Sequence, residues 1–280
     1  MHDFLADFSA DTEFLKLLTR HDQVDLPTAA LELARDAYPG LDFQPTLRWI
    51  EERGGELRGP LARVTSDEAM LHVLGESLGE RQGLVGRAEC YDLPDSSYLH
   101  RVIELKTGLP IALSVLYMAV AERAGVSLLG VGAPIHFLTR YDTLDEPLFV
   151  DAYAGGQVLT FRQCLDRVQE SSGLSEAEAR AALEPVSHRT IILRMLNNLK
   201  ALFARQTDWR ACWQVQHRLL ALRPGNYHER RDWALVSLQV GKAGSAMTML
   251  ESCLATCPDE ERESLEEKLG EAKKMMAQWN

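Results

Sequence analysis

The stretch from Thr107 to Asp151 constrains the fold of this chain more than any other. It begins with Thr107-Gly108-Leu109-Pro110, continues as an apolar run and reaches Gly125. Apolar side chains in this run cover most of the circumference of a helix, which is typical of a helix buried in the middle of a domain. We predict a central helix that ends near Ala124, with Thr107 as its N-cap and Pro110 in its first turn.

After Gly125 the sequence pattern changes from helical spacing to short runs rich in β-branched and aromatic residues. These runs cover residues 126–131, 135–141 and 148–153, and a turn at Gly155-Gly156 leads into a fourth at residues 158–159. A small antiparallel sheet packed against the central helix is therefore expected. This combination predicts a mostly helical α+β fold.

Residues 1–80 contain only helical patterns and are predicted to form an N-terminal helical region. One helix begins near Pro45 and is expected to stop at Gly54-Gly55. Another is predicted to begin with a capping box formed by Thr65 and Glu68.

The C-terminal third contains an internal repeat. Pro224 and Pro258 are 34 residues apart, which is the tetratricopeptide period, and small residues stand at matching helix-crossing positions, Cys212 and Ala246. A last helix over residues 259–280 would cap the repeats. We therefore predict three parts: residues 1–80, a core at residues 81–186, and helical repeats with their cap at residues 187–280.

Composition and charge exclude several classes of protein. The formal net charge of −11 argues against nonspecific binding to nucleic acid or to anionic membranes. The sequence offers no membrane span, signal peptide, metal-binding pattern or cofactor motif. Five scattered cysteines suit a reducing compartment, so we expect a cytoplasmic protein without cofactors or metals.

The order of helix start, histidine strand and aspartate strand resembles the transglutaminase-like (papain-like) superfamily. Gly108-Leu109-Pro110 is similar to the segment that carries the nucleophilic cysteine at the start of its helix. His136 and Asp151 are similar to the histidine and the aspartate of its catalytic strands. Such enzymes need the helix dipole to favour a thiolate and the histidine to accept its proton. Pro110 stands at the cysteine position and offers no nucleophile.

A closer resemblance points to the SirB-type invasion-regulator family of bacteria. The segment Gly108-Leu109-Pro110-Ile111-Ala112-Leu113 is similar to the Gly-x-Pro-x-x-Leu motif at the helix start in that family. The resemblance implies a transglutaminase-like core followed by tetratricopeptide repeats, and it implies no established reaction. Where family members often carry Asp-Pro, this chain has Asp151-Ala152, which affects the expected shape of the following loop.

Two other residues could supply a nucleophile. Ser114 lies one helical turn after Pro110, so a Ser114–His136–Asp151 triad is conceivable. Cys90 lies in the irregular segment 82–98 and could approach from a loop. The structural alternatives are a Ser114 hydroxyl bonded to its own helix and a His136–Asp151 pair that is a buried remnant.

Three functions are compatible with these patterns. The first is a noncatalytic regulatory protein that binds a protein or peptide partner through residues 189–280. The second is a cryptic hydrolase or acyltransferase that uses Ser114 or Cys90 with His136 and Asp151. The third is a sensor that binds a small molecule in the former substrate pocket. The sequence does not determine the oligomeric state.

Overall fold

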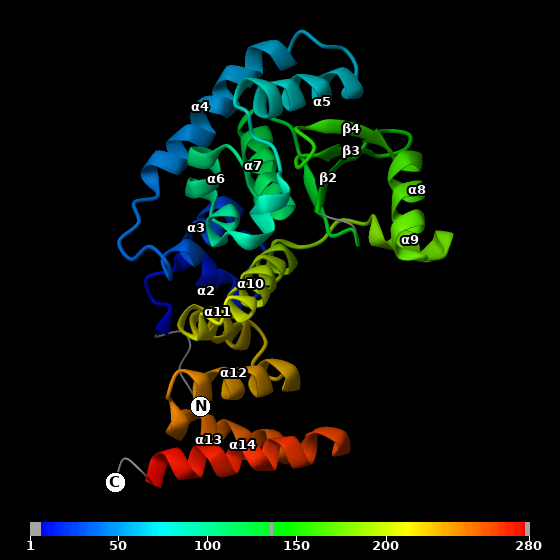
Figure 1. The fold of residues 1–280 in the computed structure, drawn as a ribbon. Helices are drawn as coiled ribbons and strands as arrows, with labels where there is room; N and C mark the ends of the chain where they lie inside the picture. Colours follow the sequence, from blue (N-terminus) through cyan, green and yellow to red (C-terminus); the bar gives the residue numbers. More distant parts are fainter. Residues whose placement is uncertain (1–6, 135–136, 278–280) are drawn as a thin grey trace. The chain divides into compact units, whose positions relative to one another are not determined.

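The computed structural model describes residues 7–134 and 137–277, and helices dominate it (Figure 1). The chain divides into two compact units. One contains residues 10–195, and the other combines the N-terminal segment up to Ser9 with the chain from Leu196 onward. The first unit contains the predicted central helix and sheet, and the second contains most of the repeats.

The larger unit is built mainly from short and medium-length helices. Over the described ranges, no helix of either unit combines the length and the apolar character needed to cross a membrane. The helices of the larger unit are α2 (Thr12–Leu18), α3 (Leu26–Ala34), α4 (Gln44–Leu61), α5 (Asp67–Gly75), the π-helix η1 (Glu76–Arg81), the 3-10 helices η2 (Ala88–Asp92) and η3 (Pro94–Ser97), α6 (Leu99–Leu105), α7 (Pro110–Arg123), α8 (Phe161–Ser172) and α9 (Glu176–Ala182).

Helix α7 is the predicted central helix, and every residue from Pro110 to Ala121 is buried. Pro110 occupies the first helical position, where its missing N–H costs no hydrogen bond. Gly125 follows the helix with φ +88°, a backbone conformation that favours glycine. The predicted cap is wrong, because the helix begins only after Leu109 and the Thr107 hydroxyl donates to the carbonyl of Val85 at 2.7 Å instead.

The described residues form one antiparallel sheet with strand order β1-β2-β3-β4, which confirms the predicted fold class. Helix α7 packs against β1 and β2, whereas α8 and α9 lie on the other side of the sheet (Figure 1). Buried side chains from the sheet, α8 and α9 form a shared core that includes Phe149, Leu159 and Leu165. The strands are β1 (Leu129–Val131), β2 (Leu138–Tyr141), β3 (Leu148–Asp151) and β4 (Gln157–Thr160).

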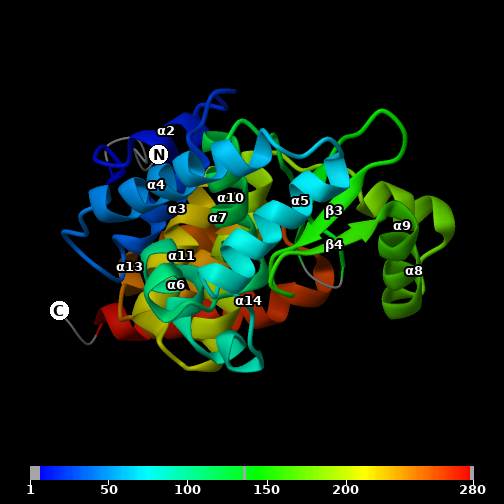
Figure 2. The ribbon, with the colours of Figure 1, turned by 90° about the horizontal axis from the view of Figure 1, so that it is seen from above.

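Glycines allow the α5–η1 segment to pack directly on the turn that follows β3. A Cβ atom on Gly79 would lie 1.8 Å from the carbonyl oxygen of Gly155, and one on Gly75 would lie 2.4 Å from that of Gly156. Both turn glycines have positive φ angles, +69° and +87°. Figure 2 shows α5 beside β3 and β4. This backbone-to-backbone contact fixes the turn immediately after Asp151.

The predicted N-terminal helices are present. A buried carboxylate joins two of them, α2 and α3. Glu32 on α3 accepts hydrogen bonds from the backbone N–H groups of Glu13 and Phe14, at 3.0 and 2.6 Å, and so caps the start of α2. Burial raises the pKa of Glu32 above its ordinary value, although these two hydrogen bonds act in the opposite direction. The carboxylate therefore ties α2 to α3.

Two predicted helix boundaries in this region are wrong. Helix α4 continues through Gly54-Gly55 to Leu61. Gly54 serves close packing instead of ending the helix, because a Cβ atom there would lie 2.3 Å from the Cβ of Arg123. At the next helix, Ser66 replaces Thr65 as the N-cap and accepts from the N–H of Ala69 at 3.2 Å.

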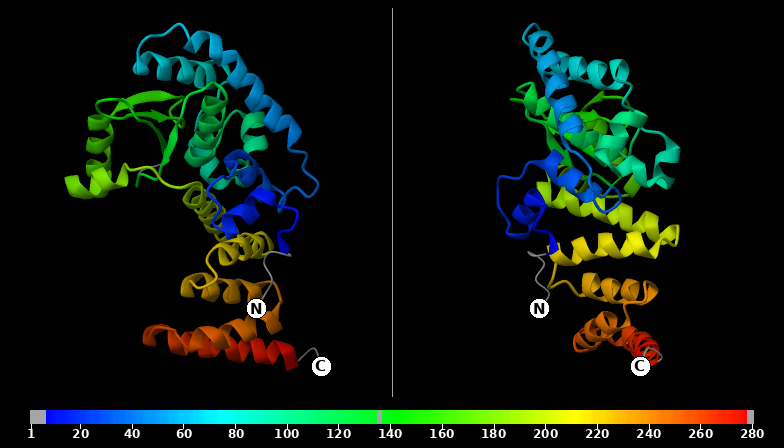
Figure 3. Two further views of the ribbon diagram at one scale, coloured as in Figure 1. Left: turned by 180° about the vertical axis from the view of Figure 1, so that it is seen from behind. Right: turned by 90° about the vertical axis from the view of Figure 1, so that its left-hand side faces the viewer.

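The C-terminal helices confirm the predicted repeats. Cys212 and Ala246 are buried, with exposures of 1% and 0%, as expected at helix-crossing positions. Between the repeats, the amide nitrogen of Gln216 donates to the carbonyl and the carboxylate of Glu229 at 3.0 and 2.9 Å. Figure 3 shows the successive layers of this helical stack. Its helices are α10 (His188–Arg205), which spans the boundary between the units, α11 (Trp209–Leu222), α12 (Tyr227–Gln239), α13 (Ala243–Leu254) and α14 (Asp259–Ala277).

The contact of Gly79 with the turn predicts that two glycine-to-alanine substitutions change the free energy of unfolding by very different amounts. Gly79→Ala is expected to lower the free energy of unfolding by about 3 kcal/mol or more, because the new methyl group meets a backbone oxygen. Gly55→Ala is the matched control, since Gly55 is exposed inside α4 with open space around it and should gain about 0.5–1 kcal/mol. Urea denaturation followed by circular dichroism measures both. Equal stability of the two variants would contradict the proposed contact.

Candidate functional site

The start of α7 is held in place by the segment that precedes it. The N–H of Leu109 donates to the carbonyl of Ser96 at 2.8 Å. Gly108 lies against Val102, where a Cβ atom would approach a valine methyl to 2.7 Å. Pro110 follows directly and is buried. The helix start is thus rigidly positioned, but its first side chain carries no reactive group.

Asp151 is the last residue of β3. Its exposure is 2%, and its Oδ1 accepts from the N–H of Ala154 at 3.1 Å. Its Oδ2 lies 4.0 Å from a guanidinium nitrogen of Arg167. The backbone carbonyl of the same residue accepts from the N–H of Gly156 at 2.9 Å. Asp151 therefore organises the turn that the glycine contact fixes from the other side.

His136 lies outside the described residues. Its neighbour Phe137 is buried and leads into β2, whose Thr139 pairs with Val150 of β3. The predicted pairing of His136 with Asp151 therefore stays a prediction.

Ser114 is fully buried on α7, with an exposure of 0%. Its hydroxyl lies 3.4 Å from the carbonyl oxygen of Phe137 and donates to it. The expected structural alternative was a bond within the helix, whereas the acceptor belongs to the segment entering β2. Ser114 thereby links the helix to the sheet, and a substrate has no direct access to its oxygen.

Cys90 lies beside Thr107 in the loop before α7, and its predicted approach to His136 stays a prediction. Its Sγ is 3.1 Å from Oγ1 of Thr107, and its exposure is 1%. The hydrogen of the Thr107 hydroxyl is used in the bond to Val85, so the thiol is the donor and the hydroxyl the acceptor. In this arrangement the side chain is shielded from solvent.

Three tyrosines that no sequence pattern indicated border this region, namely Tyr91, Tyr117 and Tyr153. Burial, followed by the negative charge of Asp151, raises the pKa of Tyr117. Tyr91 and Tyr153 have ring centroids 6.2 Å apart, and burial is also the main cause that raises the pKa of each phenol. The spacing of seven residues between Pro110 and Tyr117 could have indicated that both lie on one helix face. All three phenols are neutral near pH 7, so they can donate hydrogen bonds but not act as bases.

A small cavity lies beside the carboxylate of Asp151. Its volume is about 20 Å³, enough for one water molecule, and Cys164 and Arg167 are among the residues that line it. Burial raises the pKa of the Cys164 thiol to about 12, so this thiol is not a nucleophile near neutral pH. Within the described ranges, no three histidine, cysteine or carboxylate side chains are arranged to hold a metal ion.

Comparison with known proteins gives matches in both parts of the chain. Residues 46–197 match the transglutaminase-like superfamily, and residues 199–269 match the tetratricopeptide repeat. A UPF0162 protein of Xylella fastidiosa is 32% identical over 240 residues, which cover 85% of this chain and 85% of that protein. Protein SirB1 of Salmonella typhimurium is 22% identical over 70% of this chain and 73% of its own length. F-box only protein 21 of Mus musculus is 28% identical over 66% of this chain and 28% of its own length.

The position of Asp151 predicts a structural effect of its removal. Asp151→Ala should lower the free energy of unfolding by about 1–3 kcal/mol, because the hydrogen bond from the N–H of Ala154 to the carboxylate is lost. Asp151→Asn keeps an acceptor oxygen and should lose less. Chemical denaturation measures both changes. An unchanged midpoint for Asp151→Ala would show that the carboxylate does not stabilise the turn.

The burial of the cysteines predicts slow alkylation of the native protein. All five thiols are buried and free, so iodoacetamide at about pH 8 should react at least about 100-fold more slowly than in urea. Peptide mass spectrometry identifies the labelled residues. Rapid labelling confined to Cys90 would contradict its described environment and favour an accessible nucleophile.

Proposed function

Because this chain belongs to the transglutaminase-like superfamily and joins that fold to tetratricopeptide repeats, as SirB-type proteins do, we propose that it is a noncatalytic regulatory module. In this proposal the transglutaminase-like part is a scaffold, and residues 189–280 bind a protein or peptide partner.

One observation carries the noncatalytic part of the proposal: each candidate nucleophile is unavailable. Pro110 has no reactive atom at the helix start. Ser114 is fully buried and donates to the Phe137 carbonyl. Cys90 is shielded, and its thiol donates to Thr107. Acyl transfer requires a nucleophile that lies within hydrogen-bond reach of a base and is open to substrate. The environments of these three residues therefore support the proposal that the protein does not catalyse acyl transfer.

The remaining parts of the site have a structural role that supports the same proposal. Asp151 holds the turn that packs on Gly75 and Gly79, and Ser114 links α7 to the sheet. These interactions stabilise the fold whether or not a reaction takes place. Retention of the aspartate is therefore consistent with a scaffold.

The repeats support the binding part of the proposal. Stacked helix pairs create extended surfaces that commonly bind peptides or partner helices. The core of the second repeat and its capping helix is well packed, with Ala246, Leu250, Cys253 and Ala272 each fully buried. A rigid stack of this kind presents exposed residues of its first helices, such as His228 and Gln239 on α12, on a preformed surface.

The alternative function is a cryptic hydrolase or acyltransferase that uses Ser114 or Cys90 with His136 and Asp151. The observation that favours it is the position of Cys90, whose sulfur contacts Thr107 only three residues before Pro110. In this case a local opening would be needed to free the thiol.

Site-specific photocrosslinking in cells tests the proposed partner surface. A photoreactive amino acid at His228 or Gln239 of the full-length protein should give one dominant crosslinked protein. The matched controls are exposed positions on the second helix of the same repeat, Thr248 and Glu251, which should give at least about tenfold less of the product.

A second comparison separates binding from catalysis. The double variant Cys90→Ala/Ser114→Ala should give the same crosslinked product in the same amount, because neither side chain contributes to partner binding. The proposal is wrong if crosslinking does not distinguish α12 from α13. Loss of the product in the double variant would favour the enzymatic alternative.

A further inference from the structure

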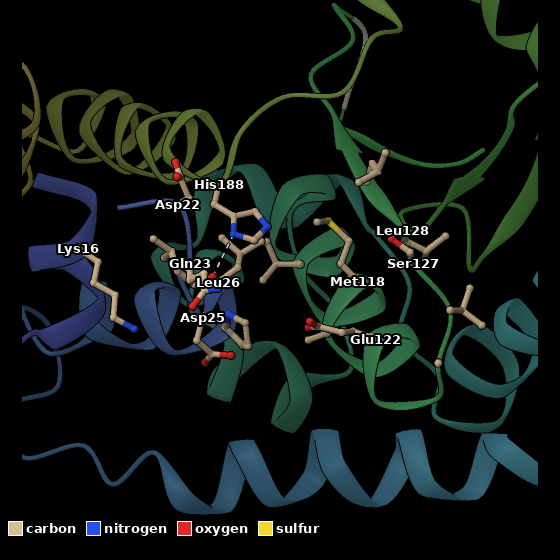
Figure 4. Close-up of a pocket in the computed structure, with 17 residues that line it drawn as sticks. Lys16, Asp22, Gln23, Asp25, Leu26, Met118, Glu122, Ser127, Leu128 and His188 are labelled. Carbon is tan, nitrogen blue, oxygen red and sulfur yellow. Dashed lines mark hydrogen bonds between the residues drawn. The ribbon is translucent and has the colours of Figure 1, made fainter. Parts of the chain in front are cut away.

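A cleft lies beside the C-terminal half of α7, away from the start of this helix. Its volume is about 720 Å³, which is within the usual range of binding sites. We define the α7 cleft by its labelled residues in Figure 4, which come from α2, the loop before α3, α7, the segment entering β1 and the start of α10: Lys16, Asp22, Gln23, Asp25, Leu26, Met118, Glu122, Ser127, Leu128 and His188.

We propose that the α7 cleft binds an extended peptide with basic side chains, which pairs with the backbone of Leu128, the residue directly before β1. This site lies within residues 10–195 and does not depend on the function proposed for the repeats. Three features support this assignment. They are the unpaired backbone groups of Leu128, the apolar floor of the cleft and the negative charges around its rim.

The outer edge of β1 is only partly paired within the protein. The N–H of Val186 donates to the carbonyl of Gly130 at 2.8 Å, and Pro185 bridges Val131 in the antiparallel sense. In this register His188 would stand opposite Leu128. However, α10 begins at His188, so the chain leaves the edge at this point.

Leu128 therefore offers backbone groups to a further strand. Leu128 lies directly before β1, and backbone groups alternate in direction along a strand, so a strand prolonged by this one residue would direct its N–H and C=O to the same edge as those of Gly130. In the part of the chain that the structure describes, no hydrogen bond occupies either group of Leu128. An unpaired edge next to a cleft is the geometry by which extended peptides add to sheets.

The floor and the rim of the cleft differ in polarity. Buried apolar side chains form the floor, including Leu26, Met118 and Leu128. In Figure 4, Asp22 and Asp25 lie on one side of the view, Ser127 and Leu128 lie on the other, and Met118 and Glu122 lie between them. Since alternate side chains of a strand point in opposite directions, an extended peptide can direct apolar residues to the floor and polar residues to the rim.

The charges around the rim select for a basic peptide. The carboxylates of Asp22, Asp25 and Glu122 line the cleft, and Lys16 is its one lining lysine or arginine among the described residues. The ammonium of Lys16 lies 2.7 Å from Glu13, and Arg123 lies near both Asp25 and Glu122, at 3.7 and 3.1 Å. Four carboxylates therefore face two cations, which leaves an excess of two negative charges. The carboxylates are Glu13, Asp22, Asp25 and Glu122, and the cations are Lys16 and Arg123. A lysine or arginine side chain over the rim would complement that excess.

Fluorescence anisotropy with the full-length protein tests this inference. The probe is a labelled decapeptide of alternating valine and lysine, at a physiological salt concentration of about 150 mM that screens general attraction to an acidic protein. It should bind at least about tenfold more tightly than a decapeptide of alternating valine and glutamate. The proposal is wrong if the lysine peptide shows no such preference or does not bind.

Two charge-reversal variants distinguish peptide binding in the cleft from general attraction to the negative charge of the protein. Asp22→Lys/Glu122→Lys should weaken binding of the lysine peptide by about tenfold or more. The matched control, Glu146→Lys/Glu170→Lys, makes the same change in net charge at exposed positions outside the cleft and should have less than about a threefold effect. Circular dichroism verifies the fold of both variants. Equal weakening by the two pairs would overturn the assignment to the cleft.

A change in the peptide backbone tests the pairing with Leu128. Methylation of alternate backbone nitrogens keeps every charge of the lysine peptide but removes N–H donors on one edge. With the methyl groups in the frame that faces Leu128, binding should weaken by at least about tenfold, and in the other frame it should weaken less. If both methylated peptides bind like the parent peptide, edge pairing is excluded.

Discussion

The burial of α7 is the interaction on which the rest of the larger unit depends. Every residue from Pro110 to Ala121 is withdrawn from solvent, so the sheet, α4 and the helices before it all pack around one apolar rod. Burial of each large apolar side chain contributes about 1.5–3 kcal/mol, and no polar face competes for a different orientation. The two ends of this helix then place the two regions of interest, the inherited site and the α7 cleft.

Around the start of α7, the described candidate residues Pro110, Ser114 and Cys90 offer no accessible nucleophile. Asp151 and Ser114 have tasks that a scaffold also needs, since one holds a turn and the other joins helix to sheet. A buried polar group that is satisfied by such bonds is costly to remove. Stability alone is thus sufficient reason to retain these side chains in the proposed noncatalytic scaffold.

Several features were predictable because their causes are local. Pro110 stands in the first turn of the central helix as predicted, and the 34-residue period indicates the repeat helices. Two of the wrong predictions share one cause, which is that a partner distant in the sequence decided the outcome. Gly54 reads as a helix breaker but serves contact with Arg123, and Thr107 reads as a cap but bonds to Val85.

The sequence by itself determined the buried central helix, the small antiparallel sheet, the repeats and the proline in the first turn of that helix, because periodicity and residue type act over short distances. Only the tertiary structure decided that Cys90 donates its thiol proton to Thr107, and that the backbone of Leu128 is left open directly before β1. Both depend on segments that meet only after folding. The physical reason is that hydrogen-bond partners and solvent access are properties of packing, which side-chain spacing along one strand or helix does not specify.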